Sequence, residues 1–527
     1  MASPILFEQN DDREFIIGST LKFFNTLSLT PTRKYHGLRN DYDLILTTLD
    51  DAVITEKKEY CLSTWFHDDY TSKKLPFFEG KLGKNWIEHN FSIDDKKVVR
   101  KIEISNNGFE VVYKIPEDMV LKIKPFFVYR NINHIQKDGL HIPPYLKISQ
   151  TKYNKTIKTV RVIRYPRENF RGYDDTELMT SFNEFYFEKK AIFEMNFENK
   201  SEDKWYSKYI LRDSLLAGLP WFDDYVRDVM VVFDLLDAKM QKKYIEKIRK
   251  QIVGGRVPNI HKTSYNTVDA GLLYVNNLLD VEKEEGLHTA KKVLDSYVCG
   301  NEDYKMDGDF LIKTLKPRLT WMDTLDRRGK PIEINAYWQS AIKKYNELSD
   351  DKFPFEKNIE HSIEKFFENG KICDILEPEN KEDLENNEKR PNFVIALEYL
   401  NPPTNVKKRI LGHMEKFYTP RGLYSLLPNS FGYQEEYIGN QEKRDFSYHR
   451  GIIWPWLMIP YIKVLKKFDE NKTDRLDEIL GELEIMKNER CVGHISELVE
   501  PKTMQQCGCP AQLWSDAILE YLKKLKN

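Results

Sequence analysis

Residues 101–115 read KIEISNNGFEVVYKI, and this stretch decides the fold class of the first part of the chain. Apolar residues take every second position on both sides of Asn107-Gly108, and mostly polar residues fill the positions between them. A period of two is typical of a strand with one buried face, and Asn-Gly is a favoured hairpin turn. The stretch therefore predicts a β-hairpin.

The same alternation recurs on the C-terminal side of this hairpin. It appears at Leu121 and Ile123, at Val160 and Val162, and over residues 185–193. Strands that each bury one face are stable when two sheets pack together. We therefore expect residues 1–195 to form a β-sandwich domain.

Beyond residue 200 the apolar period becomes helical. Apolar residues recur at helix spacing from Val226 to Leu236, and Gly254-Gly255 predicts a helix stop. Further helices are predicted at 267–281, 286–298, 332–348, 355–369, 391–400, 404–417, 452–467, 472–487 and 510–526. Helices joined by loops rich in Trp, Pro and Gly favour a toroid of helical hairpins. We expect this all-α domain to span residues 196–527, so the chain as a whole is multidomain.

Length and charge exclude several classes of protein. A chain of 527 residues is too long for one ordinary core. Lysine plus arginine (81) nearly balances aspartate plus glutamate (83), so no charge field indicates nucleic acid or an anionic membrane as a partner. A neutral substrate is compatible with that balance. The acidic and amide-rich run 377–389 predicts a solvated loop.

The opening of the sequence carries no targeting pattern. Residues 1–12 have neither a basic region nor an apolar stretch of sufficient length, and no apolar run of 18 residues follows. We therefore expect a cytoplasmic protein that is not bound to a membrane. The oligomeric state is not fixed by the sequence.

The six cysteines are scattered and do not form a disulfide framework. Cys507 and Cys509 are the one close pair, and only Cys491 and His494 lie near them in sequence. A zinc site needs more ligands at regular spacing. We expect reduced, packed thiols, no metal site and no organic cofactor.

Residues 319–338, LTWMDTLDRRGKPIEINAYW, combine groups that a sugar site needs. Asp323 stands beside Trp321, and a Gly-Pro turn follows before a predicted helix start that carries Glu333, Asn335 and Trp338. Pyranose rings stack on aromatic faces, and their hydroxyls need forked polar groups. A nearby indole can also raise the pKa of a carboxylic acid.

Hydrolysis at an anomeric centre needs a second carboxylate. The best candidate is Glu497 in the segment 493–500, GHISELVE. Most carboxylates in a chain are solvated surface groups, and that alternative applies to each acid taken alone. The Trp and Gly context favours a site for Asp323 and Glu497.

Other segments with mixed Trp, Pro, Gly and charge lie between the predicted helices. Six of the nine tryptophans lie in or beside such segments: Trp221, Trp321, Trp338, Trp454, Trp456 and Trp514. The segments themselves are GLPWFDDYVRD (218–228), VPN (257–259), YNTVDA (265–270), RPN (390–392), TPRGL (419–423) and RDFSYHRGIIWPW (444–456).

In this order, the segments resemble the glucosidase module of glycogen debranching enzymes, the amylo-α-1,6-glucosidase family with its six-hairpin (α/α)6 toroid. TRKYHGL at 32–38 is similar to a motif in the N-terminal β domain of the bacterial and archaeal members. The likeness spans nearly the whole chain. It implies an inverting hydrolase that releases glucose from α-1,6 branch stubs, with Asp323 as general acid and Glu497 as general base.

The resemblance also implies residues that line or support a glucose pocket: Arg227, Asp228, Asn259, Asn266, Asp269, Glu333, Asn335, Arg390, Asn392 and His449. Four tryptophans are the candidates for stacking on sugar: Trp221, Trp321, Trp338 and Trp454. Arg227 with Asp228 could instead be a buried ion pair at a helix start. His449 could be a packed core histidine.

Two departures from the family pattern bear on the substrate. Tyr225-Val226 stands where the family usually has Trp-Gly, and Arg450 stands where it usually has Gln. A guanidinium near a neutral sugar would change hydroxyl recognition or turn away to the surface. The region before residue 200 is too short for a (β/α)8 barrel, so no glucanotransferase half is expected.

Other functions remain open at this stage. A related toroid enzyme could be a glucoamylase-like α-glucosidase or a disaccharide phosphorylase, and phosphate would replace the catalytic base in the latter. A glycan-binding protein would keep the tryptophans and lose an acid. Glu500 is the rival of Glu497 as base, and in an extended segment the two would face opposite ways. An inverting enzyme needs its two carboxyl groups about 6.5–9.5 Å apart.

Overall fold

The computed structural model describes the chain except residues 1–3, 10, 12, 20, 29–35, 41–42, 64–74, 106–107, 132–158, 165–175, 182–184, 189, 197–203, 212–213, 221, 261–263, 403–405, 469–472 and 527. The chain divides into two compact units. A strand-rich unit comprises 1–212 and 489–493, and a helical unit comprises 213–488 and 494–527.

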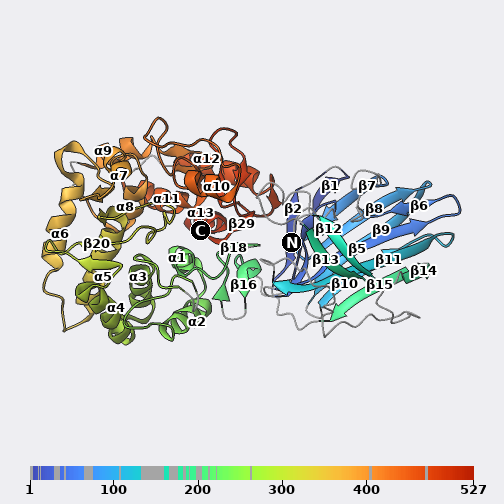
Figure 1. Cartoon of the computed structure of the whole chain (residues 1–527), viewed down its shortest axis with the longest axis horizontal. Coiled ribbons are helices and arrows are strands. Elements are labelled where there is room, and N and C mark those ends of the chain that lie inside the picture. The colour runs from blue at the N-terminus through green and yellow to red at the C-terminus, as the bar shows by residue number, and fades with distance from the viewer. Residues whose placement is uncertain are drawn as a thin grey trace. The chain divides into compact units, whose positions relative to one another are not determined.

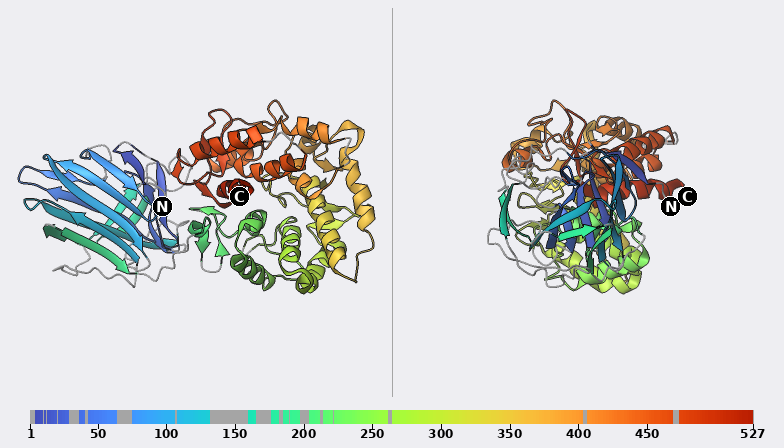
Figure 2. Two further views of the ribbon diagram at one scale, coloured as in Figure 1. Left: turned by 180° about the vertical axis from the view of Figure 1, so that it is seen from behind. Right: turned by 90° about the vertical axis from the view of Figure 1, so that its right-hand side faces the viewer.

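The strand-rich unit contains two sheets (Figures 1 and 2). The first is antiparallel and has the order β1 (Ile5–Glu8), β7 (Phe78–Leu82), β8 (Trp86–Ile93), β9 (Lys96–Ser105), β10 (Gly108–Lys114), β15 (Lys190–Asn196). In it Ile104 pairs with Phe109 and Ile102 with Val111, which confirms the predicted hairpin. Its turn, residues 106–107, lies outside the described residues.

The second sheet has the order β12 (Thr159–Arg164), β13 (Thr176–Ser181), β11 (Val120–Asn131), β5 (Asp43–Ile54), β4 (Gly37–Asn40), β3 (Leu21–Thr26), β2 (Glu14–Gly18), β26 (Cys491–Val492). β14 (Phe185–Glu188) also pairs with β11, and β6 (Glu59–Cys61) pairs with β5. β26 runs parallel to β2. A short strand β16 (Ile210–Leu211) follows late in this unit.

One apolar core joins the two sheets. Phe78 and Ile87 of the first sheet and Phe23 and Leu46 of the second belong to the same cluster of buried side chains. Burial of such side chains is the main stabilising contribution in the unit. Of the motif at 32–38, residues 36–38 are described, and His36 is buried against Glu14, with 3.1 Å between Nε2 and Oε1.

The helical unit is built on helices that contact one another in a closed cycle (Figure 1). In order around the cycle, the helices identified within the described residues are α1 (Val226–Val231), α3 (Ala270–Glu282), α5 (Ile332–Leu348), α8 (Asn392–Tyr399), α11 (Met458–Phe468) and α13 (Leu513–Lys526), which contacts α1 again.

Further helices each contact a member of the cycle: α2 (Ala238–Arg249), α4 (Leu287–Cys299), α6 (Glu356–Glu364), α9 (Lys407–Met414) and α12 (Thr473–Met486). The shorter α7 (Lys381–Glu385) and α10 (Gln441–Ser447) lie in connecting segments. Most residues of the cycle helices α3 and α5 are buried. In α2 the buried residues are confined to one face of the helix. That difference is expected between an inner and an outer helix.

Small sheets connect these helices. One has the order β23 (Tyr418–Thr419), β24 (Gly422–Tyr424), β25 (Ile453–Trp454), β27 (Leu498–Val499), β28 (Gln506–Cys507). Two-stranded pairs are β18 (Gly218–Leu219) with β29 (Ala511–Gln512), β19 (Tyr304–Met306) with β20 (Ile312–Thr314), and β21 (Lys330–Pro331) with β22 (Ile375–Leu376); β17 is Ser214–Leu215.

Two predictions about this unit are wrong in detail. The helix expected at 452–467 begins only at Met458, because Trp454 precedes a proline and is extended (φ −113°, ψ 110°). The run 377–389 is not a plain solvated loop: it contains α7, whose start is capped by the Asn380 side chain, 2.9 Å from the amide of Asp383. Asp383 and Asn386 are buried.

Within the described residues, no helix is long and apolar enough to cross a membrane.

Candidate active site

Most of the candidate residues lie where the helices of the closed cycle begin. Arg227 and Asp228 are in the first turn of α1, and Asp269 precedes α3. Glu333 is in the first turn of α5, Arg390 precedes α8, Asn392 opens α8, and Trp454 precedes α11. Arg227 Nε donates to Asp269 at 2.7 Å, and the amide of Gln512, just before α13, donates to Asp228 at 3.2 Å. These contacts hold the starts of α1, α3 and α13 together.

Asp323 lies in the loop between β20 and β21. Its Oδ2 is 3.9 Å from Arg227 Nη1, and its side chain is 43% exposed. The pKa of Asp323 is raised to about 6, first by burial; Arg227 opposes that rise, and Asp269 adds to it. Desolvation by the surrounding protein favours the neutral form of a carboxyl group, even where part of its side chain stays exposed.

Arg227 is held by Asp269 and not by Asp228. Thr267 also donates to Asp269, at 2.6 Å, so both carboxylate oxygens of Asp269 are used. The alternative of a simple Arg227–Asp228 pair is therefore wrong. Arg227 Nη2 is buried and has no hydrogen-bond partner among the described residues.

Glu497 is 3% exposed, and each of its carboxylate oxygens accepts a hydrogen bond. The hydroxyl of Tyr448 donates to Oε1, and the amide of Cys509 donates to Oε2 at 2.9 Å. Gly508 has φ +68°, and a Cβ there would lie 2.5 Å from Glu497 Oε2. The glycine therefore allows the Cys509 amide to reach the carboxylate.

Asp323 and Glu497 act on the same neighbours. The pKa of buried Asp228 is raised well above its ordinary value, first by burial, and both acids contribute to the rise. The pKa of Tyr448 is also raised, first by burial and then by Glu497, with Asp323 among the further causes. The two candidate acids are thus close enough to interact with one set of side chains. The predicted separation of their carboxyl groups stays a prediction.

Glu500 is used by its own loop. Its Oε1 accepts from the amide of Tyr437 at 3.0 Å, and its Oε2 accepts from the Thr503 hydroxyl at 2.7 Å. Glu497 and Glu500 therefore have separate sets of partners, as expected if they face different ways.

Aromatic rings pack around His449. Its ring is stacked on Trp454 with 5.0 Å between centroids, and Trp321 meets it edge-on at 5.3 Å. Thr324 Oγ1 is 2.8 Å from Nδ1, while Nε2 is buried without a partner among the described residues. The pKa of His449 lies well below its ordinary value, first because of burial. The ring is therefore neutral at pH 7.

A buried network fixes Trp321. Its Nε1 donates to Asn392 at 2.7 Å, and Asn392 donates to Asp374 at 2.8 Å. Asp374 pairs with Arg327, whose other nitrogen binds Glu333 at 2.9 Å. Glu333 and Asn392 thus belong to the hydrogen-bond network that fixes the Trp321 indole. Arg390 supports the neighbouring His449, because it donates to the backbone oxygen of that residue at 2.8 Å.

Two candidates on α5 have structural partners. Asn335 accepts from the amide of Ile312 at 2.7 Å and donates to Pro331 O at 2.9 Å. Trp338 is fully buried, donates to Phe310 O at 3.0 Å and stacks on neighbouring aromatic rings. The structure brings neither side chain into contact with Asp323 or Glu497.

The remaining candidates differ in exposure. Asn259 is buried, and its Oδ1 has no partner among the described residues. Asn266 lies nearer the surface and bonds to Ser264. Trp221 lies outside the described residues.

Sequence reasoning missed Tyr448, Cys509, Gln512 and Thr324 as neighbours of the site. Tyr448 stands next to His449 in its motif, so adjacency was a usable signal. The backbone amide of Cys509 gave no signal, because a backbone group looks the same at every position.

The departure at Arg450 has a structural explanation. Its guanidinium forms two bonds of 2.9 Å to Glu382 in α7 and lies 4.3 Å from the centre of the Phe446 ring. The Arg450 side chain thus pairs with Glu382 and not with Asp323.

The cysteines are free thiols, and Cys509 is buried. In the part of the chain that the structure describes, no group of three His, Cys, Asp or Glu side chains is arranged to hold a metal ion.

Two family models match consecutive parts of the chain. Residues 195–520 match the family model "Amylo-alpha-1,6-glucosidase", and residues 23–192 match "Glycogen debranching enzyme N terminal". A search of curated proteins gives no match.

Two solved structures from Thermus thermophilus share distant similarity. An uncharacterized conserved protein is 11% identical over 59% of this chain and 96% of its own, with a TM-score of 0.45. A GH63 mannosylglycerate hydrolase in complex with glucose is 12% identical over 60% of this chain and 98% of its own, also with a TM-score of 0.45. The family match covers most of the chain, so the protein belongs to the amylo-α-1,6-glucosidase family of glycogen debranching enzymes and is a glycoside hydrolase that acts on carbohydrate.

Proposed function

We propose that the protein is an inverting α-glucosidase that releases glucose from α-1,6-linked branch stubs of glycogen-like glucans. Asp323 is the general acid and Glu497 the general base. The observation that carries the proposal is the contrast between their surroundings.

The two carboxyl groups are held for opposite tasks. Burial raises the pKa of Asp323 to about 6, so part of the population carries a proton near neutral pH. Glu497 accepts hydrogen bonds on both oxygens, from Tyr448 and Cys509, which is how an ionised carboxylate is bound. A protonated acid and an ionised base are what inversion requires.

Catalysis then follows a single displacement. Asp323 gives its proton to the glycosidic oxygen, and Glu497 takes a proton from a water that attacks the other face of the sugar. Arg227, 3.9 Å from Asp323, stabilises the carboxylate that remains after the proton leaves. Neither step requires an organic cofactor.

The surroundings suit a neutral sugar. Arg227 Nη2, Asn259 Oδ1 and His449 Nε2 are buried polar atoms without partners among the described residues. Buried polar atoms are nearly always satisfied, so sugar hydroxyls or water are the natural partners here. Neutral His449 can exchange a hydrogen bond with a hydroxyl without adding charge.

The fold assignment belongs to the same proposal. The closed cycle of α1, α3, α5, α8, α11 and α13, with outer helices against it, supports an (α/α)6 toroid. The common core of the two sheets supports a β-sandwich. The domain limits of 1–195 and 196–527, and the cytoplasmic location, stay predictions.

One experiment tests reaction and stereochemistry together. The protein is incubated with panose, isomaltose, maltotriose and a glucosyl-branched cyclodextrin, and released glucose is followed by NMR. We expect β-glucose first, from the α-1,6-linked substrates. Initial α-glucose would place the protein in the retaining class, and a requirement for phosphate would indicate a phosphorylase.

A further inference from the structure

A cavity of about 540 Å³ opens beside Thr324, the residue that follows the candidate acid in sequence. It is lined by Arg318, Thr324, Gln441, Glu442, Asp445, Phe446 and Arg450. Thr324 follows Asp323 directly, so the cavity begins one residue from the proton donor. Of its lining residues, the sequence analysis singled out Arg450 alone, as a departure from the family pattern.

We propose that this cavity binds the first sugar residues of the leaving group, and that it selects a neutral oligosaccharide there. This inference rests on the proposed function. The acid protonates the oxygen that departs with the leaving group. Space next to the acid is therefore space for the leaving group.

Arg318 supplies a free donor in the cavity. Its side chain is exposed and forms no hydrogen bond or ion pair among the described residues. Burial raises the pKa of Asp323, and the charge of Arg318 is among the groups that oppose this rise. Its backbone has φ +66°, in the left-handed region that non-glycine residues rarely adopt. Strained residues of this kind cluster at functional sites.

Glu442 and Asp445 supply free acceptors on a separate element, α10. Both are exposed, and neither side chain has a hydrogen-bond or ion-pair partner within the described part of the chain. The positive charge of Arg318 thus stands against two negative charges, while Arg450 is already paired with Glu382. A ligand of either sign would meet a like charge, whereas a polyol can both donate and accept.

Phe446 supplies the aromatic surface. It is 49% exposed, and Arg450 covers one side of the ring at 4.3 Å from its centre. The cation holds the ring in place, and the exposed part is available for the C–H face of a pyranose. Free donors, free acceptors and an aromatic face together form the set that a sugar residue needs.

The experiment compares two substrates that differ only in the leaving group. Panose leaves maltose behind, whereas α-glucosyl fluoride leaves no sugar. Phe446→Ala should lower kcat/KM on panose about three- to ten-fold, and Arg318→Asn about ten-fold, with kcat/KM on the fluoride unchanged. Asparagine is chosen because it tolerates the left-handed backbone.

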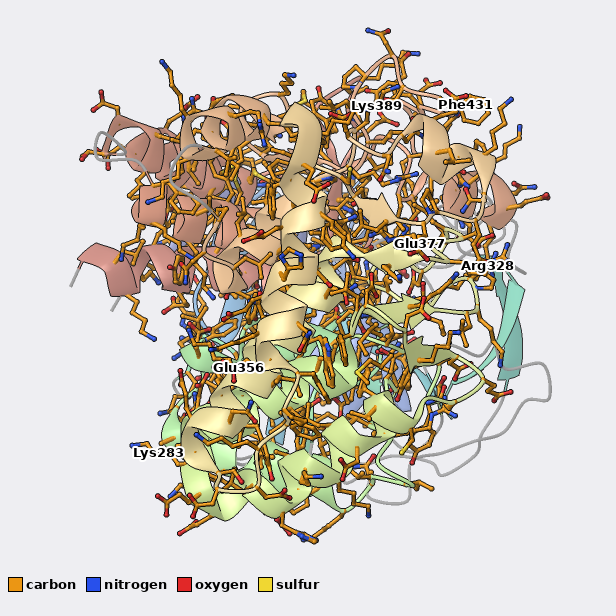
Figure 3. All side chains as sticks on the ribbon, turned by 90° about the vertical axis from the view of Figure 1, so that its left-hand side faces the viewer. Lys283, Arg328, Glu356, Glu377, Lys389 and Phe431 are labelled. Carbon is orange, nitrogen blue, oxygen red and sulfur yellow. The ribbon has the colours of Figure 1, made fainter. Side chains whose placement is uncertain are left out.

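Phe431→Ala is the matched control. Phe431 is also 49% exposed and also carries a cation near its ring, Lys381 at 5.4 Å, but it does not line the cavity. It lies at the surface of the helical unit in Figure 3. Its replacement should leave both substrates unaffected.

The outcomes separate the two proposals. Equal loss on panose and fluoride, or no loss on either, would overturn the cavity assignment while hydrolysis stands. If the unaltered protein hydrolyses neither substrate, the proposed function fails, and calorimetric titration with panose then decides the cavity alone. A weaker Kd in Phe446→Ala would support it, and an unchanged Kd would overturn it.

Discussion

Replacing Asp323 by asparagine should abolish most turnover while leaving the fold intact. The amide has nearly the same shape but cannot donate the carboxyl proton. General acid catalysis contributes about 10²–10⁴-fold, so kcat on branched substrates should fall by that factor. The corresponding rise in the barrier is about 2.7–5.4 kcal/mol.

The effect of this change on stability should be small. The charged partner nearest to Asp323 in the described structure is Arg227 at 3.9 Å, and the aspartate side chain is 43% exposed. Because burial raises the pKa of Asp323, its charged form is not favoured by folding, so replacing it with a neutral amide should not lower the Tm at neutral pH. Arg227 also keeps its closer bond to Asp269, 2.7 Å, so no buried cation is left alone.

The assay compares panose with α-glucosyl fluoride in Asp323→Asn and in the unaltered protein. Fluoride is a better leaving group than a sugar and depends less on protonation by the acid. Asp323→Asn should therefore retain most of its activity on α-glucosyl fluoride. Thermal unfolding serves as the control for folding. An equal loss on both substrates, with an unchanged Tm, would refute the role of Asp323 as proton donor.

The same site supports three other predictions. The acid must be protonated and its pKa is raised to about 6, so kcat on panose should fall above that pH, up to about tenfold per pH unit, in a pH–rate profile. Glu497→Gln should abolish hydrolysis and be partly restored by azide, whereas Glu500→Gln should keep most activity; the reverse ranking would exchange their roles. Tyr448→Phe removes a donor to Glu497 and should lower kcat about tenfold with little change in Tm; unaltered kinetics would show that this bond does not position the base.

Local patterns in the sequence were sufficient for many elements. The hairpin of β9 and β10 followed from alternation about a turn, and α5 spans the predicted 332–348, with the extended Pro331 as its N-cap. The helix predicted at 452–467 began too early, since the pattern of apolar residues continues through a short strand. Periodicity does not distinguish a short buried strand from a helical turn.

The surroundings of each candidate were less predictable. Asn335 stands in a motif with other site residues, yet its amide is used by the backbone of Ile312 and Pro331. The partners of Arg327, Glu333 and Asp374 come from separate elements, so no local pattern indicates them. Motifs identify the chemical groups of the site, and tertiary contacts decide which of them face the substrate.

The closed helical cycle also has a consequence for how the enzyme forms during synthesis. The contact between α1 and α13, and the bond from Gln512 to Asp228, join positions 284 residues apart. Contacts so distant in sequence form late in folding, because closing a long loop has a large entropic cost. Asp323 can therefore be in place on the ribosome well before Glu497, and a nascent chain has an acid without a base until the cycle closes.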